Sequence, residues 1–328
     1  MNISLFAKLF SENLLSEEEF EKINQYEKQP LSVHWDLRTL LYLGILLLTT
    51  ALSILVYKNI NTIGHDVVII FIALVCIICF GYCFKNAKGY SRQKIESPNL
   101  LFDYILLLGC LLLVTFIGYI QFQYNVFGNH WGLAAFIPAV LLFIAAYYFD
   151  HLGVLSLAIT NLAAWIGITV TPLSILRQND FESNKIIFSG MALGAFLVGL
   201  SRVITNRNHK SHFGFTYKNF GTHILFISLL AALFHFDDFY LVSFIFIIAL
   251  SFVYFKNAME EKSFYFLVST VGYFYIALSY FVIHLLTNNR MYGEGNSYAI
   301  ILYFITSGIG LIWLLIHYNK ILKKDDRL

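Results

Sequence analysis

The sequence predicts an all-α membrane protein, a polytopic bundle of about ten transmembrane helices. Hydrophobic residues make up 58% of the 328 residues and charged residues only 13%, whereas a soluble domain carries about 25% charged residues. The apolar residues stand in continuous blocks close to the roughly 20 residues that a helix needs to cross the hydrocarbon core. A transmembrane β-barrel would show strands of about ten residues with alternating polarity, so we exclude that class.

Apolar blocks divide the chain into a cytosolic helical region at 1–38, a transmembrane domain at 39–318 and a charged cytosolic tail at 319–328. The expected spans are 39–57, 67–84, 101–121, 131–148, 153–171, 185–204, 220–235, 238–255, 264–286 and 297–318. The blocks are continuous rather than broken by long polar segments, which predicts a single bundle joined by short loops.

Basic residues predict the orientation of these spans. With a cytosolic N-terminus, the cytosolic segments hold 18 of the 22 Lys and Arg residues, and the opposite side holds the other 4. Loops on the cytosolic side of a membrane carry an excess of Lys and Arg. We therefore expect both termini in the cytosol.

The region 1–38 predicts a short helical hairpin before the membrane. Within LLSEEEFEKI, Ser16 is placed to cap a helix and Glu19 follows three residues later, which is the spacing of a capping box. Pro30 ends that helix, because proline cannot continue a helical hydrogen-bond ladder. An earlier short helix over roughly residues 3–12 completes the hairpin.

The fifth expected span carries polar residues within the stretch AITNLAAWIGITVTP, residues 158–172. Asn161 lies near its middle, with Thr160 and Trp165 close by. A polar side chain at this depth either bonds a neighbouring helix or faces a solvated cavity. Bonding between helices is the commoner use, so we expect Asn161 to join two helices, and a cavity remains the alternative.

Small residues mark expected sites of close helix packing. Gly167 belongs to a small-residue stripe in the fifth span, and Gly190, Gly194 and Gly199 stand in the sixth. Residues without bulky side chains let two helix backbones approach closely in lipid. The fifth and sixth helices are therefore expected to pack together near the centre of the bundle.

The ninth expected span has a polar stripe of its own. Ser269, Tyr273, Tyr280 and His284 share one helical face. Tyrosine hydroxyls need hydrogen-bond partners when buried. We expect this stripe to serve interhelical packing, with a lined cavity as the alternative.

Ionisable residues give little sign of catalysis or ion pumping. The pairs Asp150–His151 and Asp237–Asp238 fall in tight turns near the membrane surfaces. The His and acidic residues of the outer loops lack metal-ligand spacings, so we expect no enzyme, no metal site and no cofactor. The basic loop 205–218 is expected to face anionic lipid head groups.

Two segments near the N-terminus resemble a bacterial membrane-protein family known only as a domain of unknown function, DUF2157. The first is LLSEEEFEKINQYEK and the second is RTLLYLGILLLTTALSILVYKN, so the resemblance covers about the first 60 residues. The matching residues are Leu15, Ser16, Glu17, Glu18, Tyr42, Leu43 and Gly44. The resemblance implies a multi-pass protein of the bacterial inner membrane and supplies no catalytic or binding residues.

Three functional hypotheses are compared. Small-molecule transport or sensing is preferred, because ten spans with both ends inside are common among carriers that use inverted repeats. The alternative is a structural or regulatory anchor whose N-terminal helices bind a cytosolic protein partner. The third and least favoured is an outside-facing enzyme built from His and Asp residues of the outer loops, such as Asp237 and Asp238. We expect membrane lipid as a partner and no nucleic acid, and the sequence does not fix the oligomeric state.

Overall fold

The computed structural model describes residues 64–170, 184–207, 210–288 and 294–325, with isolated positions before residue 64. The predicted hairpin within 1–38 and the first expected span, 39–57, lie almost wholly outside the described residues. The chain divides into two units, residues 1–68 and residues 69–328. The contacts described below lie within the second unit.

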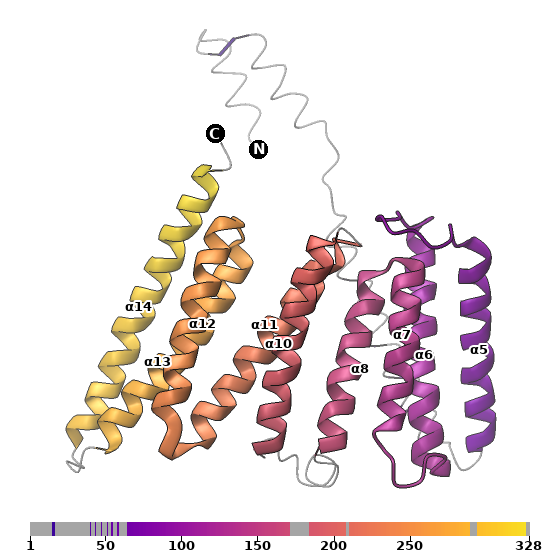
Figure 1. Ribbon diagram of the computed structural model, residues 1–328, viewed down its shortest axis with the longest axis horizontal. Helices are drawn as coiled ribbons and strands as arrows, with labels where there is room; N and C mark the ends of the chain where they lie inside the picture. The colour runs from indigo at the N-terminus through magenta and orange to yellow at the C-terminus, as the bar shows by residue number, and fades with distance from the viewer. Residues whose placement is uncertain are drawn as a thin grey trace. The chain divides into compact units, whose positions relative to one another are not determined.

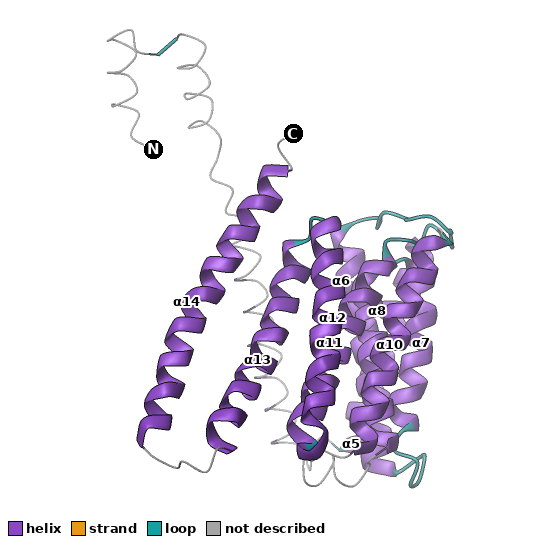
Figure 2. Cartoon of the chain, turned by 60° about the vertical axis from the view of Figure 1, so that its left-hand side comes forward, coloured by secondary structure: helices purple, strands orange, loops and turns teal. Residues whose placement is uncertain are grey.

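The described part of the chain folds into α-helices joined by loops, with one short 3-10 helix and no strand (Figures 1 and 2). The helices are α5 (His65–Asn86), α6 (Leu100–Tyr124), α7 (Leu133–Phe149), α8 (Leu152–Val170), α10 (Asn184–Asn206), α11 (Phe213–His235), η1 (Asp237–Phe239), α12 (Tyr240–Glu260), α13 (Phe264–Asn288) and α14 (Glu294–Asp325). The nine described α-helices coincide with the second to tenth expected spans. The predicted all-helical class is confirmed.

Eight of the described helices are long and apolar enough to cross a membrane. The remaining one, α7, has 17 residues and contains Pro138. At 1.5 Å per residue it is about 26 Å long, close to the hydrocarbon thickness of about 30 Å. The protein is therefore a membrane protein with several helices capable of spanning the bilayer.

Polar residues in left-handed conformations end two of these helices. Asn125 follows α6 with φ 50° and Asp150 follows α7 with φ 58°. Asn and Asp tolerate this conformation better than other residues with a side chain, and it lets the backbone N–H bond the last free carbonyl groups. The turn at Asp150 is so short that α8 begins two residues later.

Two helix boundaries differ most from the expected ones. Helix α11 begins at Phe213 instead of residue 220, because polar residues of its first turns, such as Tyr217 and Lys218, are turned toward neighbouring helices. Helix α14 continues to Asp325 through much of the segment expected as a tail. A span predicted from hydropathy ends where charged residues begin. The helix itself is held by backbone hydrogen bonds and continues beyond the hydrocarbon core.

The closest helix contact in the described bundle joins α10 to α11. A Cβ added at Gly194 would lie 2.7 Å from the backbone nitrogen of Leu225, and one at Gly190 would lie 2.3 Å from the Ser228 hydroxyl oxygen. These glycines therefore face α11, whereas the expected partner of α10 was α8. Helices α8 and α10 also pack together, but α8 packs more extensively on α7.

Glycines on α10 provide a matched stability test. We expect Gly194→Ala to destabilise the protein by about 1–3 kcal/mol, because the new methyl group meets backbone atoms that cannot move aside. A Cβ at Gly199 meets no atom within 4 Å, so Gly199→Ala is expected to be neutral or slightly stabilising through helix propensity. Denaturant unfolding in detergent micelles measures both, and equal effects would contradict this packing.

Candidate functional site

A buried ion pair holds the loops at one end of the bundle. Asp150, in the turn between α7 and α8, and Lys210, before α11, both have side chains that are 0% exposed. Lys210 Nζ lies 2.9 Å from Asp150 Oδ1, so the two side chains form an ion pair. His212 Nε2 lies 2.8 Å from the same oxygen.

The same residues reach a third segment, the loop between α5 and α6. The backbone N–H of Ile95 donates to Asp150 Oδ2, and the backbone N–H of Lys210 donates to the carbonyl oxygen of Arg92 at 2.9 Å. Three loops that the charge pattern assigns to one side of the membrane are therefore in direct contact. The expectation that loop 205–218 only faces lipid head groups is wrong at Lys210, which is buried inside this cluster.

The charges around Asp150 favour its ionised form. Burial by itself would raise the pKa of Asp150, but the Ile95 N–H, the Lys210 ammonium and the His212 ring outweigh it and the net pKa is lowered. The contribution of Asp150 to stability is therefore fully present above the ordinary carboxyl pKa of about 3.9. That contribution is lost as the pH falls through the lowered pKa of the folded state.

A second pair of ionisable groups, His151 and Asp103, lies nearby. His151 Nδ1 accepts the backbone N–H of Val154 at 3.2 Å and so caps α8. Its Nε2 lies 3.7 Å from Asp103 Oδ1. Burial lowers the pKa of His151, and Asp103 opposes that shift in part. The contacts of His151 with Val154 and Asp103 therefore help to hold the turn between α7 and α8.

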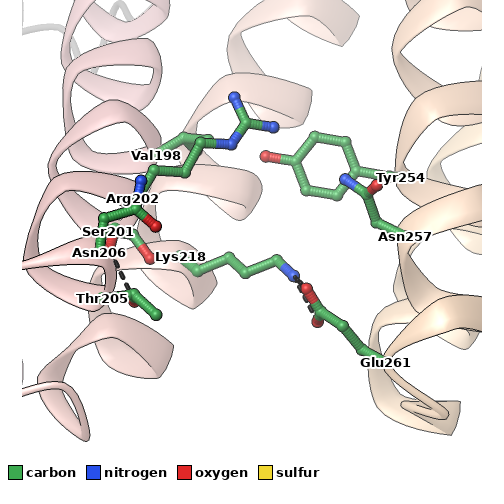
Figure 3. A pocket seen from close by; sticks show the side chains of 9 residues that line it. All are labelled: Val198, Ser201, Arg202, Thr205, Asn206, Lys218, Tyr254, Asn257 and Glu261. Atoms are coloured by element: carbon green, nitrogen blue, oxygen red, sulfur yellow. Dashed lines mark hydrogen bonds and ion pairs between the residues drawn. The ribbon is translucent and has the colours of Figure 1, made fainter. Parts of the chain in front are cut away.

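A polar pocket of about 170 Å³ opens at this same end of the bundle, between α10, α11 and α12 (Figure 3). One water needs only about 10–15 Å³ of such space, so the pocket is large enough for a small solute. Its lining residues are Val198, Ser201, Arg202, Thr205, Asn206, Lys218, Tyr254, Asn257 and Glu261. Most of these side chains are polar although they belong to membrane-spanning helices.

One wall of the pocket carries an ion pair between Lys218 and Glu261. Lys218 Nζ contacts both carboxylate oxygens of Glu261 at 2.5 Å (Figure 3). The Lys218 ammonium also lies 4.6 Å from the centre of the Phe266 ring, within the range of a cation–π contact. The charges of Lys218 and Glu261 therefore offset one another.

The opposite part of the pocket carries two hydrogen-bond donors. Arg202 has no acidic partner among the residues described. Tyr254 is 4% exposed, and its hydroxyl oxygen is buried. The Thr222 hydroxyl lies close to it and donates to the carbonyl oxygen of Lys218 at 2.6 Å, which leaves the Thr222 oxygen able to accept from Tyr254. Figure 3 shows the Tyr254 hydroxyl and the Arg202 guanidinium pointing toward one another.

The polar residues of the fifth expected span bond within their own helix. The side-chain amide of Asn161 donates to the carbonyl oxygen of Leu157 at 2.9 Å, and Thr160 donates to the carbonyl oxygen of Ser156 at 2.9 Å. Neither residue makes a hydrogen bond to another helix within the described ranges. The expected interhelical bond of Asn161 is therefore not found there, and Asn161 lines none of the pockets described here.

Trp165 lies one turn after Asn161 on α8, toward the end of the bundle opposite the polar pocket. Its ring packs on Phe136 with 4.7 Å between ring centres. It also lines a pocket of about 290 Å³ together with His130 and Trp131. Asn161 is not among the residues that line this pocket. Gly167, also in α8, takes part in a contact with another residue.

The polar stripe of the ninth expected span lies on α13 and mostly contacts side chains of α11 and α12. Tyr273 bonds His223 Nδ1 at 2.7 Å and stacks on Phe226 with 5.0 Å between ring centres. Tyr280 packs on Phe234 of α11, and His284 packs on Tyr240 of α12. Ser269 instead bonds the carbonyl oxygen of Tyr265 within its own helix. Three of these four residues thus serve contacts between helices.

Sequence reasoning did not single out Arg202, Lys218 or Tyr254. The count of basic residues places Arg202 and Lys218 on the cytosolic side, and no sequence pattern distinguishes Tyr254. The available signal was the position of Arg202, which lies inside the sixth expected span, 185–204. A basic residue within a span is costly unless it faces a cavity or a partner.

Comparison with known proteins supports the family resemblance over a wider range than expected. The family described as "Predicted membrane protein (DUF2157)" matches residues 7–155. The match takes in the N-terminal region and continues to the start of α8. Neither the curated proteins nor the solved structures give a match to this chain. The resemblance to DUF2157 is confirmed, and its extent is greater than the first 60 residues.

Across the residues searched, no group of three or more His, Cys, Asp or Glu side chains is placed to hold a metal ion. The four cysteines, Cys76, Cys79, Cys83 and Cys110, are buried free thiols. The polar pocket between α10, α11 and α12 is the candidate functional site, because charged and polar side chains from three helices meet there. Its chemistry is that of hydrogen bonding and charge recognition.

Breaking the buried ion pair is expected to destabilise the fold strongly. Asp150→Asn should cost about 3–5 kcal/mol, because it leaves Lys210 buried without a compensating charge. The double variant Asp150→Asn with Lys210→Met should lose less than the single variant. Unfolding in mixed micelles measures both, and the loss should shrink for the single variant at acidic pH, where wild-type Asp150 is itself protonated.

The control for this prediction is an exposed pair on α12. Lys256 and Glu260 are 3.8 Å apart with side chains 69% and 62% exposed. Glu260→Gln should change stability by no more than about 0.5 kcal/mol, since exposed pairs contribute little. If Asp150→Asn were as mild as Glu260→Gln, the Asp150 cluster would not be an important stabilising contact.

Proposed function

We propose that this protein binds a small molecule at the pocket between α10, α11 and α12, as a transporter or sensor of the bacterial inner membrane. The observation that carries the proposal is the Arg202 guanidinium, which lines the pocket, is exposed, and has no acidic partner among the described residues. A basic residue on a membrane-spanning helix is costly unless it faces a cavity or a partner. A bound ligand would supply the missing partner.

The charge pattern supports a pocket that opens to the cytosol. It lies at the end of the bundle that holds the Asp150 cluster and the loops 87–99 and 207–212, which are rich in Lys and Arg. The excess of basic residues on that side favours cytosolic loops and cytosolic termini. A ligand would then enter from the cytosol or from the inner leaflet.

Transport and sensing share one requirement, which is that water and solutes reach the pocket. Arg202 and Thr205 are exposed at its mouth, whereas Ser201 is only 5% exposed at its inner wall. Ser201 also bonds the carbonyl oxygen of Gly214 at 2.6 Å, so its position is fixed. A probe that reaches residue 201 has therefore entered the pocket.

Labelling of a cysteine at position 201 tests this proposal. We expect Ser201→Cys, in a chain lacking the four native cysteines, to react with a membrane-impermeant thiol reagent from the cytosolic face. Inverted and right-side-out vesicles distinguish the two faces. Thr216→Cys is the control, because Thr216 is 7% exposed near the same end of α11 and does not line the pocket. Equal, absent or opposite-face labelling would refute the proposal.

A second function is supported by the extent of the family match. That match covers 7–155 and so includes the N-terminal region but ends before the helices that line the pocket. A shared N-terminal region favours the alternative, a regulatory anchor whose N-terminal helices bind a cytosolic protein. In that case the bundle would serve mainly to hold the region 1–38 at the membrane.

Deleting residues 1–30 separates the two functions. The anchor proposal expects the truncated chain to keep its thermal unfolding profile and its labelling at position 201 but to lose activity in a strain lacking the native gene. The small-molecule proposal expects the truncated chain to retain activity while Arg202→Gln loses it. Complementation by each variant, with membrane levels matched, is the measurement.

A further inference from the structure

We infer that the group recognised in this pocket is a singly charged phosphate group, carried either by a phospholipid head or by a soluble phosphate compound. The inference rests on the proposed binding function and adds the chemical class of the ligand. It depends on the donors that line the pocket, on their net charge and on their depth in the membrane.

The first argument is the uncompensated charge of Arg202. The acidic residue of the pocket, Glu261, is held by Lys218, and the part of the chain that the structure describes offers Arg202 no other carboxylate. A guanidinium group binds the oxygens of phosphate through two parallel hydrogen bonds. Arg202 is therefore available to a ligand without first breaking an internal ion pair.

The second argument is the hydroxyl group of Tyr254. It lies beside the guanidinium group in Figure 3, and Tyr254 lines the same pocket as Arg202. Asn257, one turn further along α12, adds a side-chain amide to the same pocket. Donors from α10 and α12 thus approach from two sides, which suits the tetrahedral oxygens of phosphate better than the planar oxygens of a carboxylate.

The third argument concerns charge. Lys218 and Glu261 offset one another, so the pocket retains one positive charge, that of Arg202. A phosphodiester carries one negative charge and would leave the occupied pocket neutral. A group with two negative charges would leave an unpaired charge in a partly desolvated site, which is unfavourable.

The fourth argument is the depth of the site. Arg202 lies one turn before the end of α10 at Asn206, on a helix long and apolar enough to cross a membrane. Basic pockets between membrane helices on the cytoplasmic side are suited to anionic lipid head groups. The same donors would also accept a soluble phosphodiester that enters from the cytosol.

Binding is measured on the full-length chain purified in detergent and stripped of lipid. The lipid probe is phosphatidylglycerol, detected by native mass spectrometry, with diacylglycerol as the control that lacks phosphate. The soluble probes are glycerophosphoglycerol and inorganic phosphate, followed by calorimetric titration, with glycerol as their control. Binding of phosphatidylglycerol alone indicates the lipid source, and binding of a soluble probe indicates the soluble one. Either result supports the inference.

Three variants connect binding to the pocket. Arg202→Gln should weaken binding at least about tenfold, because hydrogen bonds to a charged group contribute that much. Arg207→Gln, an exposed residue after the end of α10 that does not line the pocket, should bind like the wild type. Tyr254→Phe should weaken binding, because it removes the hydroxyl that lies beside the guanidinium group of Arg202.

Two results would overturn the inference. One is that no phosphate probe binds above its phosphate-free control. The other is that Arg202→Gln and Tyr254→Phe, both shown to be folded by size-exclusion chromatography, bind as the wild type does.

If position 201 is still labelled from the cytosol, only the phosphate assignment fails and the proposed function stands. If position 201 is not labelled, both fail. Tyr254→Phe is nearly isosteric, so the test holds even if Arg202→Gln does not fold.

Discussion

The buried ion pair of Asp150 with Lys210 is the contact on which the polar end of the bundle depends. Two charges removed from water are tolerated only when each compensates the other, so the turn after α7 and the loop before α11 must meet. The backbone N–H of Ile95 donates to the second carboxylate oxygen of Asp150, so the loop between α5 and α6 is held at the same place. Loops that are far apart in sequence are therefore fixed by a single carboxylate.

Close packing of α10 on α11 completes the framework of the pocket. Gly194 of α10 faces α11 and Gly221 of α11 faces α10, and neither position has room for a side chain. At the end near the loops, Ser201 bonds the carbonyl oxygen of Gly214 and holds the same two helices in register. Lys218 of α11 then reaches Glu261 at the end of α12. The pocket is the space that remains between these fixed helices.

Several parts of this arrangement follow from sequence patterns. Continuous apolar blocks predict the helices because backbone groups in lipid must bond within their own segment. The distribution of Lys and Arg groups the loops 87–99, 150–151 and 207–212 on one side, and the contacts of Asp150 and Lys210 bring those loops together. The glycines of α10 predict close packing, but the pattern does not identify the partner. Gly190 and Gly194 face α11, and Gly199 faces open space.

The candidate site shows where sequence patterns stop being sufficient. Asn161 was the most conspicuous polar residue in a span, yet its amide bonds its own helix because a carbonyl four residues earlier is always within reach. Arg202, Lys218, Tyr254 and Glu261 stand on three helices, and no local pattern links them. The sequence by itself determined the membrane class, the helices and the grouping of the loops, because these depend on hydrophobicity and charge along the chain. Only the tertiary structure decided which polar groups meet, because helix rotation and packing determine whether a side chain bonds its own backbone, a neighbour or a pocket.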